Sequence, residues 1–287
     1  MKAGIIGGGK VGCCLAKYLK KSGCLKYITV STEEGSQILA EKFQLEKADN
    51  NRLIKEADVI FLTVPDRKVK AVADEIAQKS DKEQLCGKLF IHCSGSLSLD
   101  VLETLAAKGA QTGSMHPLQS FAAGVKVNLQ GVYMAVDGNE QVRAVIEKIV
   151  HLLGGHSFFV PAEERILYHC AACICSNYAV TLEYLAKSLM ERWVGNKSEA
   201  WNALKPLFQG TVRNMQQAES LEKALTGPIA RGDSNTVAAH LAKLPPEYYP
   251  VYSSLGLLTA QIALANGTID SKTMQQICSL LRNPEVN

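Results

Sequence analysis

Several features are missing from this chain, and each absence removes a class of protein. No stretch reaches the roughly 18 consecutive apolar residues that a membrane-spanning helix needs. The apolar run at the N-terminus lasts only a few residues before glycines interrupt it, so it predicts a strand and not a signal peptide. No basic run occurs, and the net charge of the 287 residues is only +3, which does not indicate a nucleic-acid partner. We therefore expect a cytoplasmic globular protein without a nucleic-acid or membrane partner.

The nine cysteines do not form the pattern of a disulfide framework, because they are scattered and odd in number. Their apolar surroundings are typical of reduced cysteines that pack as small apolar residues in the cytosol. The cluster of His169, Cys170, Cys173 and Cys175 lies in an apolar helical pattern, where only His169 and Cys173 share a face. We therefore expect no metal site.

The most informative segment is GIIGGGKVG at residues 4–12, which contains the G-x-G-x-x-G fingerprint of dinucleotide-binding proteins. Gly7 would make the tight turn after a strand, Gly9 would let the backbone approach a pyrophosphate, and Gly12 would let the next helix pack closely. The phosphates would lie on free N–H groups at the start of a helix over 10–22. The alternative is a glycine-rich turn without a ligand, but strand, turn, helix and strand follow in the expected order.

The first half of the chain alternates between strand and helix patterns, which predicts a doubly wound parallel Rossmann sheet of the α/β class. The expected strands are 2–6, 27–31, 57–64, 88–93, 111–116, 132–136 and 157–160. The expected helices between them are 10–22, 36–43, 68–78, 99–108 and 140–153.

After Pro161 the pattern becomes helical, with expected helices over 163–193, 199–224, 234–241, 248–266 and 271–281. No convincing strand pattern follows. We therefore expect a dinucleotide-binding domain over residues 1–160 and an all-helical domain over residues 161–287 that binds substrate and forms a homodimer.

The choice between NAD and NADP depends on the end of the second strand, about 20 residues beyond the fingerprint. Ser31 and Thr32 occupy this position, and hydroxyl side chains there suit the 2′-phosphate of NADP. Glu33 follows directly, where a carboxylate could bind the ribose of NAD or stabilise a helix N-terminus. The sequence favours NADP and leaves NAD open.

Ligands of an open parallel sheet bind outside the carboxyl ends of its strands. This rule selects residues 63–66, 92–96 and 113–117, together with 163–177 at the entrance to the helical half. The residues expected to bind the cofactor are Gly7, Gly9, Lys10, Val11, Gly12, Ser31, Thr32, Val64, Pro65, Ser94 and Gly95.

Hydride transfer needs a group that handles the accompanying proton, and histidine suits this task because its pKa lies near neutrality. His116 is the first candidate, and its alternative is a histidine that binds the backbone at a strand end. His169 is the second, and its alternative is a core histidine. The Ser94 hydroxyl could meet the substrate, while the Asn177 amide could orient a carbonyl group or bind a neighbouring helix.

One loop of the helical half, LTGPIARGD at residues 225–233, combines a rigid turn with two opposite charges. Arg231 could bind a carboxylate or phosphate of the substrate. Alternatively, Asp233 caps the helix that begins at Ser234, and Arg231 pairs with Asp233.

Six segments together resemble Rossmann-like proteins with a DUF2520 C-terminal domain, over almost the whole chain. These segments are GIIGGGKVG, FLTVPD, IHCSGSLS, GSMHPLQSF, YHCAACICSNY and LTGPIARGD. This family is similar to NADP oxidoreductases of the coenzyme F420-dependent type, pyrroline-5-carboxylate reductase and the β-hydroxyacid dehydrogenases. The resemblance implies a Rossmann domain followed by a helical domain that often contributes to a dimer.

Two neighbouring families bear on the catalytic residues. GSMHPLQSF is similar to a segment of prephenate and arogenate dehydrogenases whose histidine lies at the substrate, which supports His116. The β-hydroxyacid dehydrogenases use the lysine of a K-x-x-x-N motif, but residues 163–177 offer Arg165 and His169 and no lysine at that spacing. Because a guanidinium group stays protonated, Arg165 would be a poor proton shuttle.

The sequence therefore predicts an NAD(P)-dependent oxidoreductase that transfers a hydride between nicotinamide and a small polar substrate with a carboxylate. One alternative is a sensor or regulatory protein that binds NAD(P) without catalysis. Another is an enzyme similar to prephenate dehydrogenase.

Overall fold

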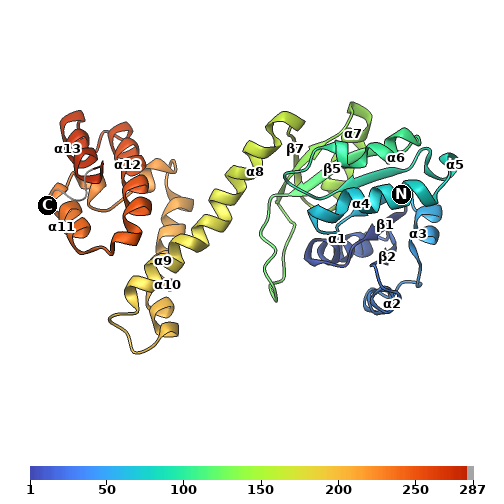
Figure 1. The fold of residues 1–287 in the computed structure, drawn as a ribbon, viewed down its shortest axis with the longest axis horizontal. Helices are drawn as coiled ribbons and strands as arrows, with labels where there is room; N and C mark the ends of the chain where they lie inside the picture. Colours follow the sequence, from blue (N-terminus) through green and yellow to red (C-terminus); the bar gives the residue numbers. More distant parts are fainter. Residues whose placement is uncertain (283–287) are drawn as a thin grey trace. The chain divides into compact units, whose positions relative to one another are not determined.

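The computed structural model describes residues 1–282 of the chain (Figure 1). The contacts between residues divide it into two compact units, Met1–Leu182 and Glu183–Asn287. We refer to them as the first and second unit and describe each by itself.

The first unit is built on a seven-stranded sheet of order β2-β1-β3-β4-β5-β6-β7. The strands are β1 (Ala3–Ile6), β2 (Leu25–Thr29), β3 (Val59–Leu62), β4 (Leu89–His92), β5 (Gln111–Pro117), β6 (Tyr133–Asp137) and β7 (His156–Phe159). The helices between them are α1 (Lys10–Lys21), α2 (Glu33–Lys42), α3 (Asn50–Glu56), α4 (Asp66–Lys79), α5 (Lys82–Leu85), the 3₁₀ turn η1 (Leu99–Leu102), α6 (Glu103–Ala107) and α7 (Glu140–Leu152). The expected doubly wound Rossmann sheet is confirmed, and α3 and α5 are two short helices that the sequence pattern did not predict.

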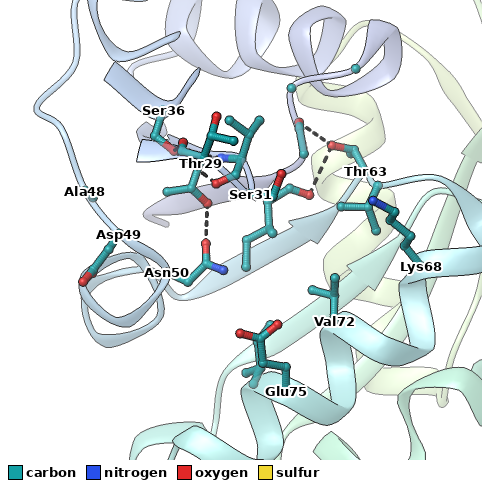
Figure 2. Close-up of a pocket in the computed structure, with 18 of the residues that line it drawn as sticks. Thr29, Ser31, Ser36, Ala48, Asp49, Asn50, Thr63, Lys68, Val72 and Glu75 are labelled. Atoms are coloured by element: carbon teal, nitrogen blue, oxygen red, sulfur yellow. Dashed lines mark hydrogen bonds between the residues drawn. The ribbon is translucent and has the colours of Figure 1, made fainter. Parts of the chain in front are cut away.

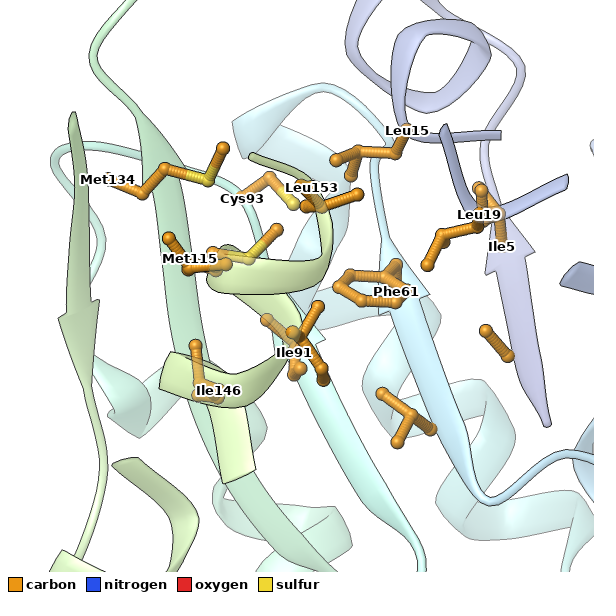
Figure 3. Close-up of a cluster of buried hydrophobic side chains, with 14 of the residues drawn as sticks. Ile5, Leu15, Leu19, Phe61, Ile91, Cys93, Met115, Met134, Ile146 and Leu153 are labelled. Atoms are coloured by element: carbon orange, nitrogen blue, oxygen red, sulfur yellow. The ribbon is translucent and has the colours of Figure 1, made fainter. Parts of the chain in front are cut away.

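The central strands are buried along their whole length because both faces of the sheet are covered. On one face, Phe61 and Ile91 pack against Leu15 and Leu19 of α1 and Ile146 of α7 (Figure 3). On the other face, alternate residues of the same strands pack against α3, α4, α5 and α6. Successive side chains of a strand point to opposite faces of the sheet, so each central strand contributes residues to both hydrophobic cores.

The order of the strands reverses at β1, because the chain continues from β1 to β2 on one side and then crosses to β3 on the other. Such a reversal leaves a crevice at the carboxyl ends of the two central strands, where open α/β sheets bind ligands.

One strand pair departs from the expected parallel arrangement, since β5 and β6 are antiparallel. The other neighbouring strands are parallel. Residues 118–132 connect β5 to β6 without a helix. Two parallel strands need a crossover connection, usually a helix, whereas an irregular loop can return the chain antiparallel.

The helical part of the chain begins after β7, as expected, but its first segment belongs to the first unit. The 3₁₀ turn η2 (Ala162–Glu164), α8 (Arg165–Cys173) and the π-helical segment η3 (Ile174–Tyr178) precede α9 (Ala179–Met190), which runs across the division at Leu182. The compact units thus divide about 20 residues beyond the change of pattern at Pro161, because Arg165 and Tyr168 contact the sheet.

The second unit contains only helical elements within its described residues, and its core lies between α11, α12 and α13. Its elements beyond α9 are α10 (Lys197–Gln217), η4 (Glu222–Ala224), η5 (Ile229–Arg231), α11 (Ser234–Lys243), η6 (Pro246–Tyr248), α12 (Tyr249–Ala265) and α13 (Ser271–Arg282). Asp233 caps α11, since its carboxylate accepts hydrogen bonds from the Thr236 N–H at 3.0 Å and the Thr236 hydroxyl at 2.6 Å.

None of the helices within residues 1–282 has the length and apolar character to span a membrane.

Candidate cofactor cavity and proton-transfer site

A cavity of about 1250 Å³ lies where the strand order reverses (Figure 2). Its wall is formed by the segments that follow β1, β2 and β3, by the start of α3 and by one side of α4. The residues expected to bind a cofactor that line it are Gly7, Gly9, Lys10, Val11, Ser31, Thr32, Val64 and Pro65. Gly12, Ser94 and Gly95 are not part of this lining.

The three glycines of the fingerprint have different surroundings. A Cβ on Gly12 would lie 2.1 Å from the carbonyl oxygen of Gly7. Gly7 itself has φ +124°, and a Cβ there would lie 2.6 Å from the carbonyl carbon of Thr63. A Cβ on Gly9, in contrast, would meet no atom closer than the Thr63 oxygen at 3.8 Å. Packing within the protein therefore requires Gly7 and Gly12, whereas Gly9 leaves open space at the cavity.

The N-terminus of α1 lies in the wall of the cavity and carries no side-chain cap. Gly9 is the N-cap, and the first turn of α1 contains no acidic residue. The neighbouring helices α2 and α3 are capped by Thr32 and Asp49. Because the first N–H groups of a helix need an acceptor and carry partial positive charge, the start of α1 can bind an anion from the cavity.

The end of β2 presents hydroxyl groups and charged side chains to the same cavity. The Thr32 hydroxyl accepts a hydrogen bond from the Gly35 N–H at 3.2 Å, so it caps α2 and is less free for a ligand than expected. Ser31 is exposed and lines the cavity. Lys47 also lines it and forms an ion pair with Glu33, which holds the pKa of the Glu33 carboxyl below its usual value.

Lys47 was not predicted from the sequence, because it comes from the connection between α2 and α3 and not from the fingerprint. Arg52 lines the cavity as well and binds Glu46 at 2.6 Å and Glu56 at 3.1 Å. Only the fold brings these cations to the end of β2.

Ser94 shapes the loop after β4. Its hydroxyl donates to the Asp66 carboxylate at 2.6 Å and accepts from the Ser96 and Leu97 N–H groups, each at 3.2 Å. Since Ser94 is only 6% exposed, these bonds commit its hydroxyl to the protein and not to a substrate, which differs from our expectation. Asp66 lines the cavity, so its contact with Ser94 joins the cavity to the loop that begins the next site.

His116, Tyr168 and His169 meet at this loop. The His116 Nδ1 lies 2.6 Å from the Tyr168 hydroxyl oxygen, and the rings of His116 and His169 lie 6.2 Å apart. A Cβ on Gly95 would lie 2.8 Å from carbon atoms of both histidine rings. Because Gly95 has no side chain, both histidine rings can approach the loop. Tyr168 and His169 belong to α8, which brings them to the end of β5 that carries His116.

The surroundings of His116 and Tyr168 favour their neutral forms. Burial, with smaller contributions from the charges of His169 and Arg165, lowers the pKa of His116 to about 4. Burial raises the pKa of Tyr168 to about 12, although the positive charge of Arg165 acts in the opposite direction. At neutral pH the pair therefore consists of an imidazole and a phenol.

Arg165 fixes α8 to the sheet. Its guanidinium group, on a residue that is 1% exposed, donates from Nη1 to the Ser114 hydroxyl at 2.8 Å and from Nη2 to the Ser94 carbonyl at 2.7 Å. The Asp137 carboxylate lies 3.9 Å from Nη1. Burial lowers the pKa of Arg165, but the nearby carboxylate opposes this effect. One buried charge thus connects the carboxyl ends of β4 and β5 and the end of β6 to α8.

Two further residues of the site, His92 and Cys93, stay uncharged at neutral pH. His92 is fully buried, and burial lowers its pKa to about 3. Cys93 is also buried, and its pKa is raised to about 12, so its sulfur stays a thiol.

His169 also has a contact within its own helix, and the two other predicted site residues are exposed. The His169 Nδ1 lies 3.7 Å from the Cys173 sulfur. Asn177 is exposed in the π-helical segment, roughly 12 Å along the helix axis from His169 at 1.5 Å per residue. Arg231 is exposed at the end of η5 in the second unit. A group of three or more potential metal ligands does not occur among residues 1–282.

The fold and the cavity place the chain in the Rossmann-like class, and residues 1–117 match the model of the Rossmann-like domain. Residues 132–259 match the model of the domain of unknown function DUF2520. The chain thus carries a Rossmann-like domain followed by a DUF2520 domain, as the sequence resemblance predicted.

Solved structures share this fold over nearly the whole chain. The protein TM1727 of Thermotoga maritima is 26% identical with a TM-score of 0.70, over 92% of this chain and 99% of that chain. A "putative NADP oxidoreductase BF3122" of Bacteroides fragilis is 23% identical with a TM-score of 0.68, over 91% and 98% of the two chains. Pyrroline carboxylate reductase of Plasmodium falciparum, solved with NADP bound, is 13% identical with a TM-score of 0.61, over 96% and 98%. No curated protein matches the sequence.

Proposed function

We propose that this protein is an NADP-dependent oxidoreductase that transfers a hydride between nicotinamide and a small polar substrate with a carboxylate group. The observation that carries this proposal is the connection of two sites within the first unit. A cavity with an uncapped helix N-terminus reaches Asp66, and Asp66 binds the loop on which His116, Tyr168 and His169 meet.

The residues of the cavity fit a dinucleotide. The N–H groups of Lys10 and Val11 would hold the pyrophosphate, with Gly9 leaving room for it. Val64 and Pro65 would lie against the nucleotide at the end of β3. Gly95, on the loop that Ser94 joins to Asp66 of the cavity, would face the nicotinamide. When bound, the nicotinamide supplies or accepts the hydride, while His116 handles the proton.

NADP fits this cavity better than NAD because the end of β2 offers hydroxyl and cationic groups. Ser31 and Lys47 would bind a 2′-phosphate, and the Glu33 carboxylate is already neutralised by Lys47. The NADP bound to the Plasmodium falciparum enzyme of the same fold supports this preference.

The helical half would complete the enzyme. We propose that residues 161–287 bind substrate and form the homodimer, with Asn177 orienting the substrate and Arg231 of a dimer partner pairing with its carboxylate. Large apolar side chains exposed on α8 and α9, including Ile166, Val180 and Tyr184, support an interface there. The nine free cysteines support a cytoplasmic location.

The test begins with the purified full chain titrated with NADPH and NADH, with nicotinamide fluorescence as the readout. NADPH should bind more tightly than NADH, and absence of binding by both would refute the proposal. Turnover is then measured on a panel of keto acids, hydroxy acids and imines. His116→Gln should lose turnover and keep its affinity for NADPH, while His151→Gln, at an exposed histidine of α7, should behave like the wild type.

Binding without turnover across the whole panel would favour the alternative of a nucleotide-binding sensor.

A further inference from the structure

The two ring nitrogens of His116 have different surroundings. Nδ1 lies 2.6 Å from the Tyr168 hydroxyl oxygen. Nε2 has no hydrogen-bond partner within residues 1–282. This nitrogen is not buried, so water can reach it. Only Nε2 can therefore exchange a proton with a small molecule.

The partner of Nδ1 determines which nitrogen carries the proton. A phenol is a stronger hydrogen-bond donor than a neutral imidazole, and an imidazole nitrogen is a stronger acceptor than a phenol oxygen. The stable arrangement has the Tyr168 O–H donating to Nδ1, which leaves the proton of the neutral imidazole on Nε2. The opposite arrangement would expose a lone pair on Nε2 but would pair the weaker donor with the weaker acceptor.

The charges around the ring oppose a second proton on His116. Burial disfavours the imidazolium form, as do the charges of His169 and Arg165 of α8, whereas the charge of Asp66 of α4 favours it. His92 of β4 adds no positive charge at neutral pH, because its own pKa is about 3. Because the lone pair of the ring on Nδ1 is bound to Tyr168, Nε2 presents an N–H donor, and not a basic lone pair, to a small molecule.

We propose that His116 and Tyr168 form a proton relay that delivers a proton from His116 Nε2, so that the resting site is arranged for reduction of a carbonyl or imine bond. This inference rests on the proposed function and adds the direction of the reaction to it. Tyr168 does not touch the substrate in this scheme and acts through His116.

With reduced nicotinamide bound, the substrate carbon would gain a hydride, and the substrate oxygen or nitrogen would gain the proton from His116 Nε2. The Tyr168 O–H bond breaks as its proton moves to His116 Nδ1, so His116 stays neutral and Tyr168 becomes a phenolate. Burial disfavours this phenolate and raises the pKa of Tyr168 to about 12, while the positive charge of Arg165 opposes that effect and would stabilise the phenolate until water returns the proton.

The test is NMR spectroscopy of the full chain with ¹⁵N-labelled histidine, which reports the protonated nitrogen and the pKa of each ring without any substrate. His116→Gln assigns the signals. In the wild type, we expect His116 to carry its proton on Nε2, with Nδ1 as acceptor, and to stay neutral above about pH 5. A proton on Nδ1, or titration near pH 6.5, would overturn the inference.

Tyr168→Phe removes only the hydroxyl group. Because the lost hydrogen bond favours the neutral ring, the pKa of His116 should rise by about one, and both tautomers should appear. Tyr252→Phe is the matched control, since Tyr252 lies 2.8 Å from a nitrogen of His240 in the second unit and should not affect His116. An unchanged His116 in Tyr168→Phe would also overturn the inference.

Failure of the proposed function remains distinguishable, because it would appear as absence of NADPH binding, whatever the state of the ring. If Tyr168→Phe does not fold, the ring nitrogen that carries the proton of His116 in the wild type still tests the proposed relay.

Discussion

Replacing single glycines of the fingerprint by alanine separates a structural from a ligand-binding requirement. In Gly12→Ala, the new Cβ would lie 2.1 Å from the Gly7 carbonyl oxygen, although such contacts do not fall below 3.0 Å in real proteins. Because both atoms belong to or adjoin the backbone, α1 must move by roughly 1 Å, and such overpacking costs about 3 kcal/mol. We expect the melting temperature of this variant to fall by about 6–12 °C.

In Gly9→Ala, the backbone angles of φ −68° and ψ −173° are open to alanine, and the nearest atom is 3.8 Å from the new Cβ. Loss of a glycine N-cap costs about 1 kcal/mol, so the melting temperature should fall by only about 2–4 °C. The methyl group would enter the cavity beside the first N–H groups of α1. Losing one charge-assisted hydrogen bond to phosphate costs about 1.5–3 kcal/mol, which raises the Kd for NADPH by about 10- to 150-fold.

The assay pairs thermal unfolding followed by circular dichroism with NADPH titration followed by fluorescence. Gly210→Ala is the control, since a Cβ there meets no atom within 4 Å, and it should keep the affinity of the wild type. Wild-type affinity in Gly9→Ala would refute the position assigned to the pyrophosphate. Wild-type stability in Gly12→Ala would refute the packing argument.

Three further changes test separate parts of the account. Lys47→Gln should raise the Kd for NADPH about tenfold and leave that for NADH unchanged, since only NADPH carries the 2′-phosphate, whereas the exposed Lys21→Gln should alter neither. Arg165→Met should lower the free energy of unfolding in urea by about 3–5 kcal/mol, because it leaves Asp137 and two buried acceptors without their cation, and a loss below about 1 kcal/mol would contradict this role. His92 has a pKa of about 3 in the folded state, below the ordinary value of 6.5, so its contribution to stability is present above pH 6.5 and is lost as the pH falls toward 3. Between pH 7 and 5 the wild type should therefore lose about 2 kcal/mol more than His92→Asn in urea unfolding, and equal losses would be inconsistent with a neutral buried His92.

Much of the first unit follows from the sequence because its strands are buried on both faces. Residues 57–64 read as one apolar run, and β3 occupies the middle of it. Short helices such as α3 were not predicted, since Leu53 and Ile54 are its only buried residues and give no helical periodicity. The antiparallel β5–β6 pair depends on a connection without a helix, which strand patterns alone do not reveal.

The cavity was largely predictable because the fingerprint specifies local backbone geometry, and Gly7 to Val11 line it. Lys47 was not, because its place at the end of β2 depends on the path of the chain between two helices. Arg165 and Tyr168 contact residues about 50 to 70 positions away in the sequence. One signal could have indicated them, since residues 165, 168 and 169 lie at i, i+3 and i+4, which share one face of a helix.

The central claim is that a nicotinamide dinucleotide binds along the carboxyl ends of β1 to β4. A crystal structure of the full chain with NADPH tests it most directly. We expect pyrophosphate oxygens within about 3 Å of the Lys10 and Val11 N–H groups, the 2′-phosphate beside Lys47, and the nicotinamide ring at Gly95 facing His116. A crystal grown with saturating NADPH in which the nucleotide lies outside this cavity would contradict the account.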